Sequence, residues 1–243
     1  MSQSFAKYTE TSVNAYKFNL KSREIVERKQ EIMRSIAQHH GCSPASILFY
    51  GFSPLMLASS CKNISVTDIT PEIKNFLDEQ SIKYTYIAED DLGQHHKKFN
   101  WVVVGDEYYT FAETEQEQLD KIIATSALAK DLIVTTLRDY KNQDFRDREF
   151  SQPLAVHAHS DAKIFLEYHS YNFVDKNSWN TSVYELDGPT AKMYGTFARR
   201  SMFFKQMAKF SIDAGAKNFF VHKNLMYKSL IKKNYEHVIS ISF

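Results

Sequence analysis

Glycine is scarce in this chain, and its scarcity limits the nucleotide-binding turns that the sequence can build. Only seven of the 243 residues are glycine, although such turns use glycine freely because their backbone approaches the ligand closely. The sequence has no Walker A loop, and a dinucleotide-binding G-x-G-x-x-G loop at Gly51 would need glycine in place of Ser53 and Met56. Both of these nucleotide sites are therefore disfavoured.

Cysteine and long apolar runs are also nearly absent, which argues against several other classes of protein. Cys42 and Cys61 are too few for a disulfide framework and do not by themselves form a metal site. No apolar run approaches the roughly 18 residues of a membrane span, and the first ten residues lack the apolar core of a signal peptide. We therefore expect a soluble, cytoplasmic protein without a membrane partner.

A group of histidines supplies the best candidate metal ligands. His157 and His159 would share one face if their segment is a strand, and His169 follows nearby. Their spacing matches no familiar metal site, so we expect no bound metal. The chain also lacks the G-x-S-x-G turn of serine hydrolases, which argues against a nucleophilic triad.

Charge is unevenly distributed along the chain. Residues 190–243 carry ten Lys and Arg against two acidic residues, whereas the remainder carries 20 against 27. A basic segment on an acidic body is typical of proteins that bind an anionic partner such as nucleic acid. It is also compatible with docking between the two parts of the chain, or with a solvated face.

The segment from about residue 47 to residue 139 alternates short apolar runs with helical patterns. The expected strands are residues 47–50, 64–66, 83–87, 101–104 and 132–136, and the expected helices are residues 54–60, 70–79 and 113–129. Strands that alternate with helices form βαβ units with right-handed crossovers. The pattern therefore predicts an α/β three-layer sandwich around a mainly parallel, doubly wound sheet.

The flanking segments are expected to add helices and further strands. Residues 22–40 predict an amphipathic helix, residues 1–14 are polar and expected to fray, and residues 139–153 are expected to form a surface loop. Beyond them we expect strands at 163–173, 181–186, 218–221 and 238–242, and helices at 198–214 and 225–233. We divide the chain into an N-terminal helical segment (1–46), an α/β domain (47–189) and a basic C-terminal α/β extension (190–243) packed on it.

Four of the expected strands end in residues that suit one nucleoside-like ligand. These strand ends are Tyr50-Gly51-Phe52-Ser53, Asp68-Ile69, Glu89-Asp90 and Asp106-Glu107-Tyr108. The carboxyl ends of parallel strands meet at one edge of a sheet, where α/β proteins bind their ligands. A carboxylate after the second strand can accept hydrogen bonds from both hydroxyl groups of a ribose.

This order of residues resembles the motifs of class I S-adenosylmethionine (AdoMet) methyltransferases over about 95 residues. Ile47 to Leu55 lie over the family's first motif, usually written V-L-D-x-G-C-G-P-G, and Asp68 follows Gly51 by 17 residues, like the family's acidic second motif. The resemblance implies a class I methyltransferase-like (Rossmann-type) fold, AdoMet as the cofactor and methyl transfer as the activity.

The resemblance also implies roles for individual residues. The cofactor site would comprise Tyr50, Gly51, Phe52, Ser53, Asp68, Ile69, Glu89 and Asp90. Asp106, Glu107 and Tyr108 would be catalytic residues that orient the methyl acceptor or receive its proton. Each of these also has a structural alternative: Asp68 as a helix cap, Asp106 and Glu107 as solvated loop acids, and Tyr108 as a packed aromatic.

The first motif departs from the family pattern at three positions. Phe49 replaces its acidic residue, and Ser53 and Leu55 replace two of its glycines. Two classes of function therefore stay open. The first is an AdoMet-dependent methyltransferase whose acceptor is a nucleic acid or a small molecule. The alternative is a catalytically inactive methyltransferase-like fold that serves as a binding or assembly module.

Overall fold

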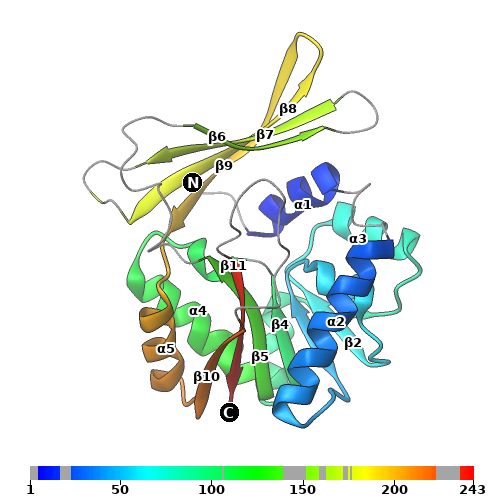
Figure 1. Ribbon diagram of the computed structural model, residues 1–243, viewed down its shortest axis with the longest axis vertical. Coiled ribbons are helices and arrows are strands. Elements are labelled where there is room, and N and C mark those ends of the chain that lie inside the picture. Colours follow the sequence, from blue (N-terminus) through cyan, green and yellow to red (C-terminus); the bar gives the residue numbers. More distant parts are fainter. Residues whose placement is uncertain are drawn as a thin grey trace.

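The computed structural model contains two β-sheets and a set of helices packed around the larger sheet (Figure 1). It describes residues 5–16, 23–105, 107–138, 152–158, 163–171, 175, 177–222 and 236–243. No helix in these ranges is long and apolar enough to cross a membrane.

The larger sheet has seven strands in the order β10-β11-β5-β4-β1-β2-β3. Its parallel strands are β1 (Ile47–Tyr50), β2 (Ile64–Thr67), β3 (Thr85–Tyr86), β4 (Phe99–Val104) and β5 (Ala129–Arg138). Strand β11 (Glu236–Ser242) is antiparallel to both β5 and β10 (Asn218–His222). The predicted mainly parallel, doubly wound sheet is therefore confirmed.

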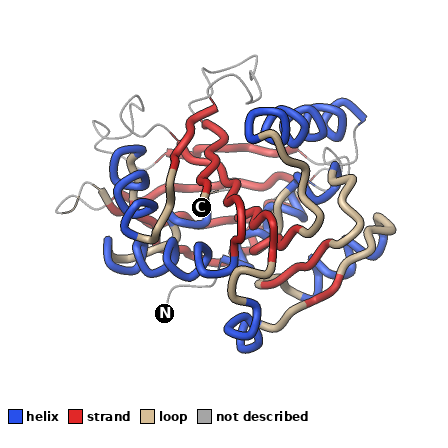
Figure 2. Tube along the Cα trace, turned by 90° about the horizontal axis from the view of Figure 1, so that it is seen from below, coloured by secondary structure: helices blue, strands red, loops and turns tan. Residues whose placement is uncertain are grey.

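Helices cover both faces of this sheet, as Figure 2 shows from below. On one side lie α2 (Arg23–His40) and α3 (Pro71–Glu79), and on the other lie α4 (Glu115–Leu128) and α5 (Phe204–Asp213) (Figure 1). Thr70 caps α3 by accepting a hydrogen bond from Ile73 N, and Pro71 fills its first turn. The sequence alone predicts both roles, because Thr is a preferred helix cap and Pro suits the first helical position.

The central strands are apolar at consecutive positions because both of their faces are buried. The side chains of Ile47, Phe49, Trp101, Val103, Leu132 and Val134 belong to the core under α2 and α3. The intervening Leu48, Val102, Val104 and Ile133 belong to the core under α4 and α5. Successive side chains on a strand point to opposite faces, so one apolar run supplies both cores.

The smaller sheet has four antiparallel strands in sequence order: β6 (Gln152–Ala158), β7 (Lys163–Tyr171), β8 (Ser178–Asp187) and β9 (Thr190–Arg200). It lies beyond the carboxyl edge of the seven-stranded sheet, and the chain returns from β9 directly into α5 (Figure 1). The division proposed after residue 189 falls in the turn between the paired strands β8 and β9. The 190–243 segment contributes to both sheets.

The N-terminal segment corrects one expectation from the sequence. Residues 5–16 form the helix α1 (Phe5–Tyr16) rather than a frayed end, and Phe5, Tyr8 and Val13 on it are buried. The helix lies between the four-stranded sheet and the rest of the molecule (Figure 1). It contacts β6, β9 and α3, so tertiary packing holds in place a segment whose own sequence is mostly polar.

Two further expectations need correction. The expected helix at 198–214 is in fact the end of β9 followed by the shorter α5, because residues 190–200 complete the hairpin with β8. The expected helix after β1 is a single 3-10 segment, η2 (Pro54–Ala58). Most of the expected loop at 139–153 lies outside the described residues, and its last two residues, 152–153, begin β6 instead. The expected helix at 225–233 also lies outside the described residues.

Candidate functional site

The chain reverses the direction of strand addition between β1 and β4. From β1 the sheet grows through β2 to β3, and the chain then returns to place β4 on the other side of β1. Such a switch point opens a crevice at the carboxyl ends of the strands, where doubly wound proteins bind ligands. Gly51 and Gly105 follow β1 and β4 there, and Gly105 N donates to Tyr50 O at 2.9 Å.

Glycine is required on both sides of this crevice because an aromatic ring packs directly against the backbone. A Cβ atom built on Gly51 would lie 2.5 Å from Phe5 Cε1, and one built on Gly105 would lie 2.8 Å from Phe5 Cζ. Gly51 also has φ +73, which side chains rarely adopt. Phe5 was not among the residues expected in the site.

Asp68 stands at the end of β2, next to this crevice, as the sequence predicts. Its backbone is left-handed (φ +51), which aspartate tolerates better than most residues. The pKa of the Asp68 carboxyl group is raised to about 7, mainly by burial and also by the nearby Glu89 charge, while Lys121 opposes both. Among the described residues no cation lies within ion-pair distance of Asp68. Asp68 is therefore a partly buried acid without an ion-pair partner in the described part of the chain, a frequent property of functional groups.

Three of the predicted residues form a chain of hydrogen bonds from β4 to the third strand end. Tyr108 donates to Tyr50, whose hydroxyl group donates to Glu89 Oε1 at 3.5 Å. The rings of Tyr50 and Tyr108 lie 5.0 Å apart. Burial is the main cause that raises the pKa of Tyr50 to about 12, and it also raises the pKa of Tyr108. Both phenols are therefore neutral hydrogen-bonding groups near pH 7.

Lys121 on α4 adds a cation to the site that the sequence did not single out. Its ammonium group lies 4.8 Å from the centre of the Tyr108 ring, donates to the carbonyl oxygen of Phe111 and is 3.7 Å from Glu117 Oε1. Burial lowers the pKa of Lys121. Lys121 lies on an amphipathic helix, where a lysine is normally solvated, so no local signal marks it.

Glu107, expected to be catalytic, belongs to a buried ion pair. The Glu107 and Arg199 side chains are only 5% and 2% exposed, and Arg199 Nη2 donates to Glu107 Oε2 at 2.7 Å. Arg199 Nε also donates to Thr110 Oγ1 at 2.9 Å, and its guanidinium group lies 4.0 Å from the Phe111 ring centre. This pair joins the end of β4 to β9. Its geometry favours a structural role for Glu107.

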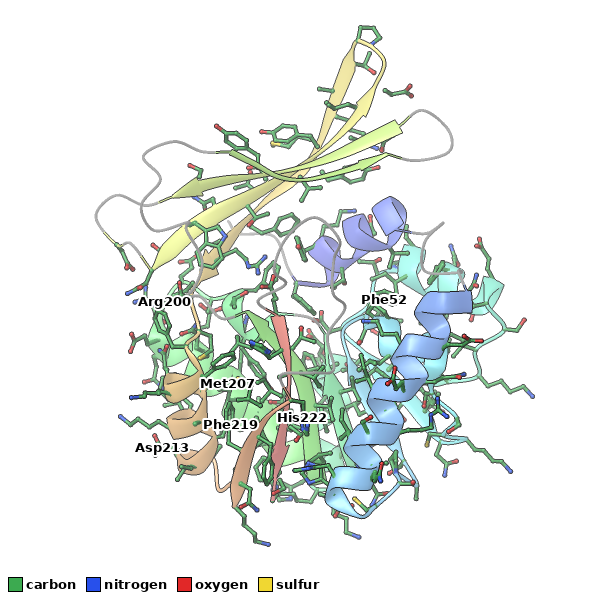
Figure 3. All side chains as sticks on the ribbon, viewed as in Figure 1. Phe52, Arg200, Met207, Asp213, Phe219 and His222 are labelled. Atoms are coloured by element: carbon green, nitrogen blue, oxygen red, sulfur yellow. The ribbon has the colours of Figure 1, made fainter. Side chains whose placement is uncertain are left out.

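The other predicted cofactor residues do not converge on Asp68. Phe52, shown beside η2 in Figure 3, packs its ring 5.9 Å from that of Phe76 in the core under α2 and α3. Ser53 is buried and accepts a hydrogen bond from Leu55 N. Ile69 packs against the same core, and Asp90 is exposed in the 3-10 segment η3 (Glu89–His95). Asp106 lies outside the described residues.

The sites of departure from the family's first motif also lie in the core. Phe49 is fully buried and Leu55 nearly so, and both belong to the core under α2 and α3. The side chains that replace the family's acid and its last glycine therefore pack away from Phe5 and Tyr108, which belong to the other core. The crevice itself keeps only Gly51 from that motif.

Some basic side chains of the C-terminal region are engaged in contacts within the molecule. Arg199 is buried, and Arg200 forms ion pairs with Asp175 and Glu115 near the start of α5 (Figure 3). Lys205 and Lys209 on α5 are exposed. Binding of nucleic acid by residues 190–243 thus stays a prediction, but Arg199 cannot belong to a phosphate-facing surface.

The histidine hypothesis concerns side chains that are not described. His157 and His169 lie on the paired strands β6 and β7, whereas His159 falls outside the described ranges. Within the described part of the chain, no group of three potential ligands could hold a metal ion.

Comparison with solved structures finds methyltransferases across nearly the whole chain. An S-adenosylmethionine-dependent methyltransferase from Clostridium acetobutylicum matches 97% of this chain and 98% of its own, with a TM-score of 0.68 and 12% identity. An amino pentose methyltransferase from Micromonospora echinaspora, solved with SAM bound, matches 95% and 96% (TM-score 0.64, 9% identity). A sugar N-methyltransferase from a Streptoalloteichus species matches 100% and 93% (TM-score 0.65, 7% identity).

No family model and no curated protein matches this sequence. The structural likeness therefore establishes the fold: the chain has a class I methyltransferase-like fold, as its strand-end motifs indicated. The likeness extends over the four-stranded sheet as well as the seven-stranded one, since the matches cover almost the full length of both chains.

Proposed function

We propose that this protein is an AdoMet-dependent methyltransferase that acts on a small-molecule acceptor. The observation that carries the proposal is Asp68, a partly buried carboxyl group that has no ion-pair partner among the described residues and lies at the end of β2, beside the crevice of the switch point. A carboxylate at this position suits two ribose hydroxyl donors. The proteins of similar fold, named as sugar and amino pentose methyltransferases, support a small acceptor.

The residues around the crevice fit the parts of AdoMet to different degrees. Asp68 would accept hydrogen bonds from the ribose, and Gly51 and Gly105 would let the backbone approach the cofactor closely. Glu89 or Asp90 would face the adenine amino group at the end of β3. Bound there, AdoMet supplies an electrophilic methyl group on a sulfonium, which an acceptor nitrogen or oxygen attacks in line.

Tyr108 is the best-placed of the predicted catalytic residues. The methyl group replaces a proton on the acceptor, so that proton must leave the site. Tyr108 is neutral and hydrogen-bonded through Tyr50 to Glu89, which is exposed to solvent. It would orient the acceptor by a hydrogen bond, and the chain of hydroxyl groups offers the acceptor proton a route to solvent.

The inactive binding module is the second candidate, and a specific observation favours it. Phe5 lies in contact with the two glycines of the crevice, so the molecule as described has an aromatic ring where a ligand is expected. A module that never binds AdoMet would keep this ring in place permanently.

Calorimetric titration with S-adenosylhomocysteine, the demethylated product, separates the two candidates. We expect wild-type protein to bind it and Asp68→Asn to bind about 10–100-fold more weakly, because hydrogen bonds to a charged acceptor are lost. Asn tolerates the left-handed backbone at this position. Asp213→Asn, the same change at an exposed site on α5 (Figure 3), is the control and should bind like wild type. Absence of binding to folded wild-type protein would contradict the proposal that the protein is an AdoMet-dependent methyltransferase.

Transfer of a labelled methyl group then tests the acceptor. Amino and hydroxyl sugars are offered beside RNA and DNA, and we expect label only in the small molecules. Labelled nucleic acid, with binding that weakens steeply as salt rises, would instead support the prediction based on the basic 190–243 region.

A further inference from the structure

We propose that α1 is a gate whose Phe5 side chain competes with the cofactor for the crevice between β1 and β4. This inference rests on the proposed function, because it concerns the ligand of that same site. The regulatory element is the N-terminal helix, which lies outside the methyltransferase motifs. This helix closes the crevice, and Phe5 must leave the crevice before AdoMet can enter.

The contacts of the Phe5 ring leave no room for another molecule beneath it. The ring lies so close to Gly51 and Gly105 that a single added carbon on either residue would be 2.5–2.8 Å from ring atoms. The ring therefore touches the backbone of both turns, and Phe5 is 5% exposed. A ligand bound against these turns at the switch point and the Phe5 ring cannot be present together.

The ring is held by aromatic neighbours that also belong to the candidate site. Phe5 makes edge-to-face contacts with Tyr108 and Phe111, each with ring centres 5.0 Å apart. One turn further along α1, the centres of the Tyr8 and Phe197 rings lie 5.3 Å apart. The Arg199 guanidinium group lies 5.5 Å from the centre of the Tyr8 ring. These contacts tie α1 to β9 of the four-stranded sheet as well as to the end of β4.

The character of α1 makes it suited to release. It has 12 residues, and an isolated helix of this length is marginal in water. Its attachment therefore depends on the side chains that it buries, and Phe5 is the one of them that fills the crevice.

Competition of this kind weakens the apparent affinity by the fraction of molecules in which the crevice is free. Phe5→Ala removes the competing ring while the seven-stranded sheet and Asp68 remain. We expect Phe5→Ala to bind S-adenosylhomocysteine at least about tenfold more tightly than wild type in calorimetric titration. Val13→Ala is the comparison variant, because Val13 is buried on the same helix but packs in the other core. It loosens α1 without removing the competing ring, so its gain in affinity should be clearly smaller than that of Phe5→Ala.

Each pattern of results has a defined meaning. Binding to Phe5→Ala that is equal to or weaker than binding to wild type overturns the gate and leaves the methyltransferase proposal standing. Binding to Phe5→Ala alone supports both proposals. Absence of binding to both proteins overturns both. A gain in Val13→Ala as large as that in Phe5→Ala also overturns the role assigned to the Phe5 ring.

Hydrogen exchange of the wild-type protein tests the gate without any substitution. We expect the amides of residues 5–16 to exchange faster when S-adenosylhomocysteine is bound, since α1 then leaves its packed position. Unchanged or slower exchange of α1 in the bound protein overturns the proposal, even if Phe5→Ala fails to fold. A folded Phe5→Leu variant, with a smaller apolar side chain, should show an intermediate gain in affinity.

Discussion

Two acids follow strands of the same sheet, and they differ in what neutralises them. Asp68 comes directly after β2, whereas Glu107 comes after β4 with two residues between, and both have a left-handed backbone. Glu107 is buried and Asp68 is partly buried. Glu107 receives a hydrogen bond from Arg199 at 2.7 Å. Asp68 has no ion-pair partner among the described residues, and burial raises its pKa to about 7.

The difference separates a structural acid from a functional one. A buried carboxylate with its own arginine is satisfied within the fold, and removing either partner is costly. A desolvated carboxyl group without such a partner destabilises the fold at neutral pH and is ready to accept donors from a ligand. The same functional group, in the same backbone conformation, therefore has opposite consequences at the ends of two strands.

The largest effect should follow from breaking the pair at β4. Arg199→Met removes the arginine that is paired with the buried Glu107 carboxylate, so we expect the free energy of unfolding to fall by about 3–5 kcal/mol. Urea denaturation followed by circular dichroism measures the loss. If the loss is below about 1 kcal/mol, Glu107 is not a structural acid and its catalytic role returns.

A second substitution provides the control for that experiment. Glu107→Gln in the Arg199→Met background removes the negative charge of the Glu107 side chain, and we expect it to restore most of the lost stability. Arg200→Met is the matched arginine control. The side chains of its partners Glu115 and Asp175 are 62% and 38% exposed, so the loss of these pairs should cost no more than about 1 kcal/mol.

A change in the free energy of unfolding of the opposite sign is expected at the end of β2. Asp68→Asn removes a carboxylate that the fold disfavours at pH 8, so the free energy of unfolding should rise by about 1–2 kcal/mol while cofactor affinity falls. The same denaturation experiment measures the change. A loss of stability comparable with that of Arg199→Met would show that Asp68 is a structural acid after all.

Much of the fold was accessible from the sequence because its signals are local. The bounds of β1 were predicted to the residue, and α3 was predicted together with its cap, Thr70. By contrast, α1 and the β9 hairpin depend on partners far away in the chain. Phe5 and Tyr8 are buried by contacts with a residue that follows β4 and with β9. Residues 198–200, expected to be helical, pair with β8 instead.

The site was predictable where strand ends alone define it. Asp68, Tyr50, Glu89 and Tyr108 come together because parallel strands end at one edge. The pairing of Glu107 with Arg199, 92 residues apart, leaves no local pattern in the sequence. The position of Phe5 over Gly51 also leaves no local pattern in the sequence, because an aromatic residue near the start of the chain does not by itself indicate which residues it packs against.

The titration of Asp68 should make cofactor binding depend on pH. Ribose hydroxyl donors require the ionised carboxylate, and the pKa of Asp68 in the free protein is about 7. We expect the affinity for S-adenosylhomocysteine to fall about tenfold between pH 8 and pH 6. Calorimetry across this range measures it, and Asp68→Asn should remove most of the dependence. A flat wild-type profile would exclude Asp68 as the ribose acceptor.

Titration of Asp68 should also make the stability of the free protein depend on pH, but in the opposite direction: stability falls as the pH rises, whereas cofactor affinity increases. Because the folded pKa of Asp68 lies above the unfolded value of 3.8, its contribution to stability is fully present below pH 3.8. That contribution is lost as the pH rises through 7. Comparing wild type with Asp68→Asn in denaturation at several pH values isolates this contribution from the other titrating groups.

The smallest expected effect distinguishes the two acids at the end of β3. The charge of Glu89 is one cause of the raised pKa of Asp68, so Glu89→Gln should move the midpoint of the affinity profile to lower pH. The shift should be roughly half a unit, because interactions of exposed charges are weak. Asp90→Asn, the neighbouring change at another exposed acid, should leave the midpoint in place. An equal shift in both variants would mean that general surface charge, and not the Glu89 position beside Tyr50, tunes the acid at β2.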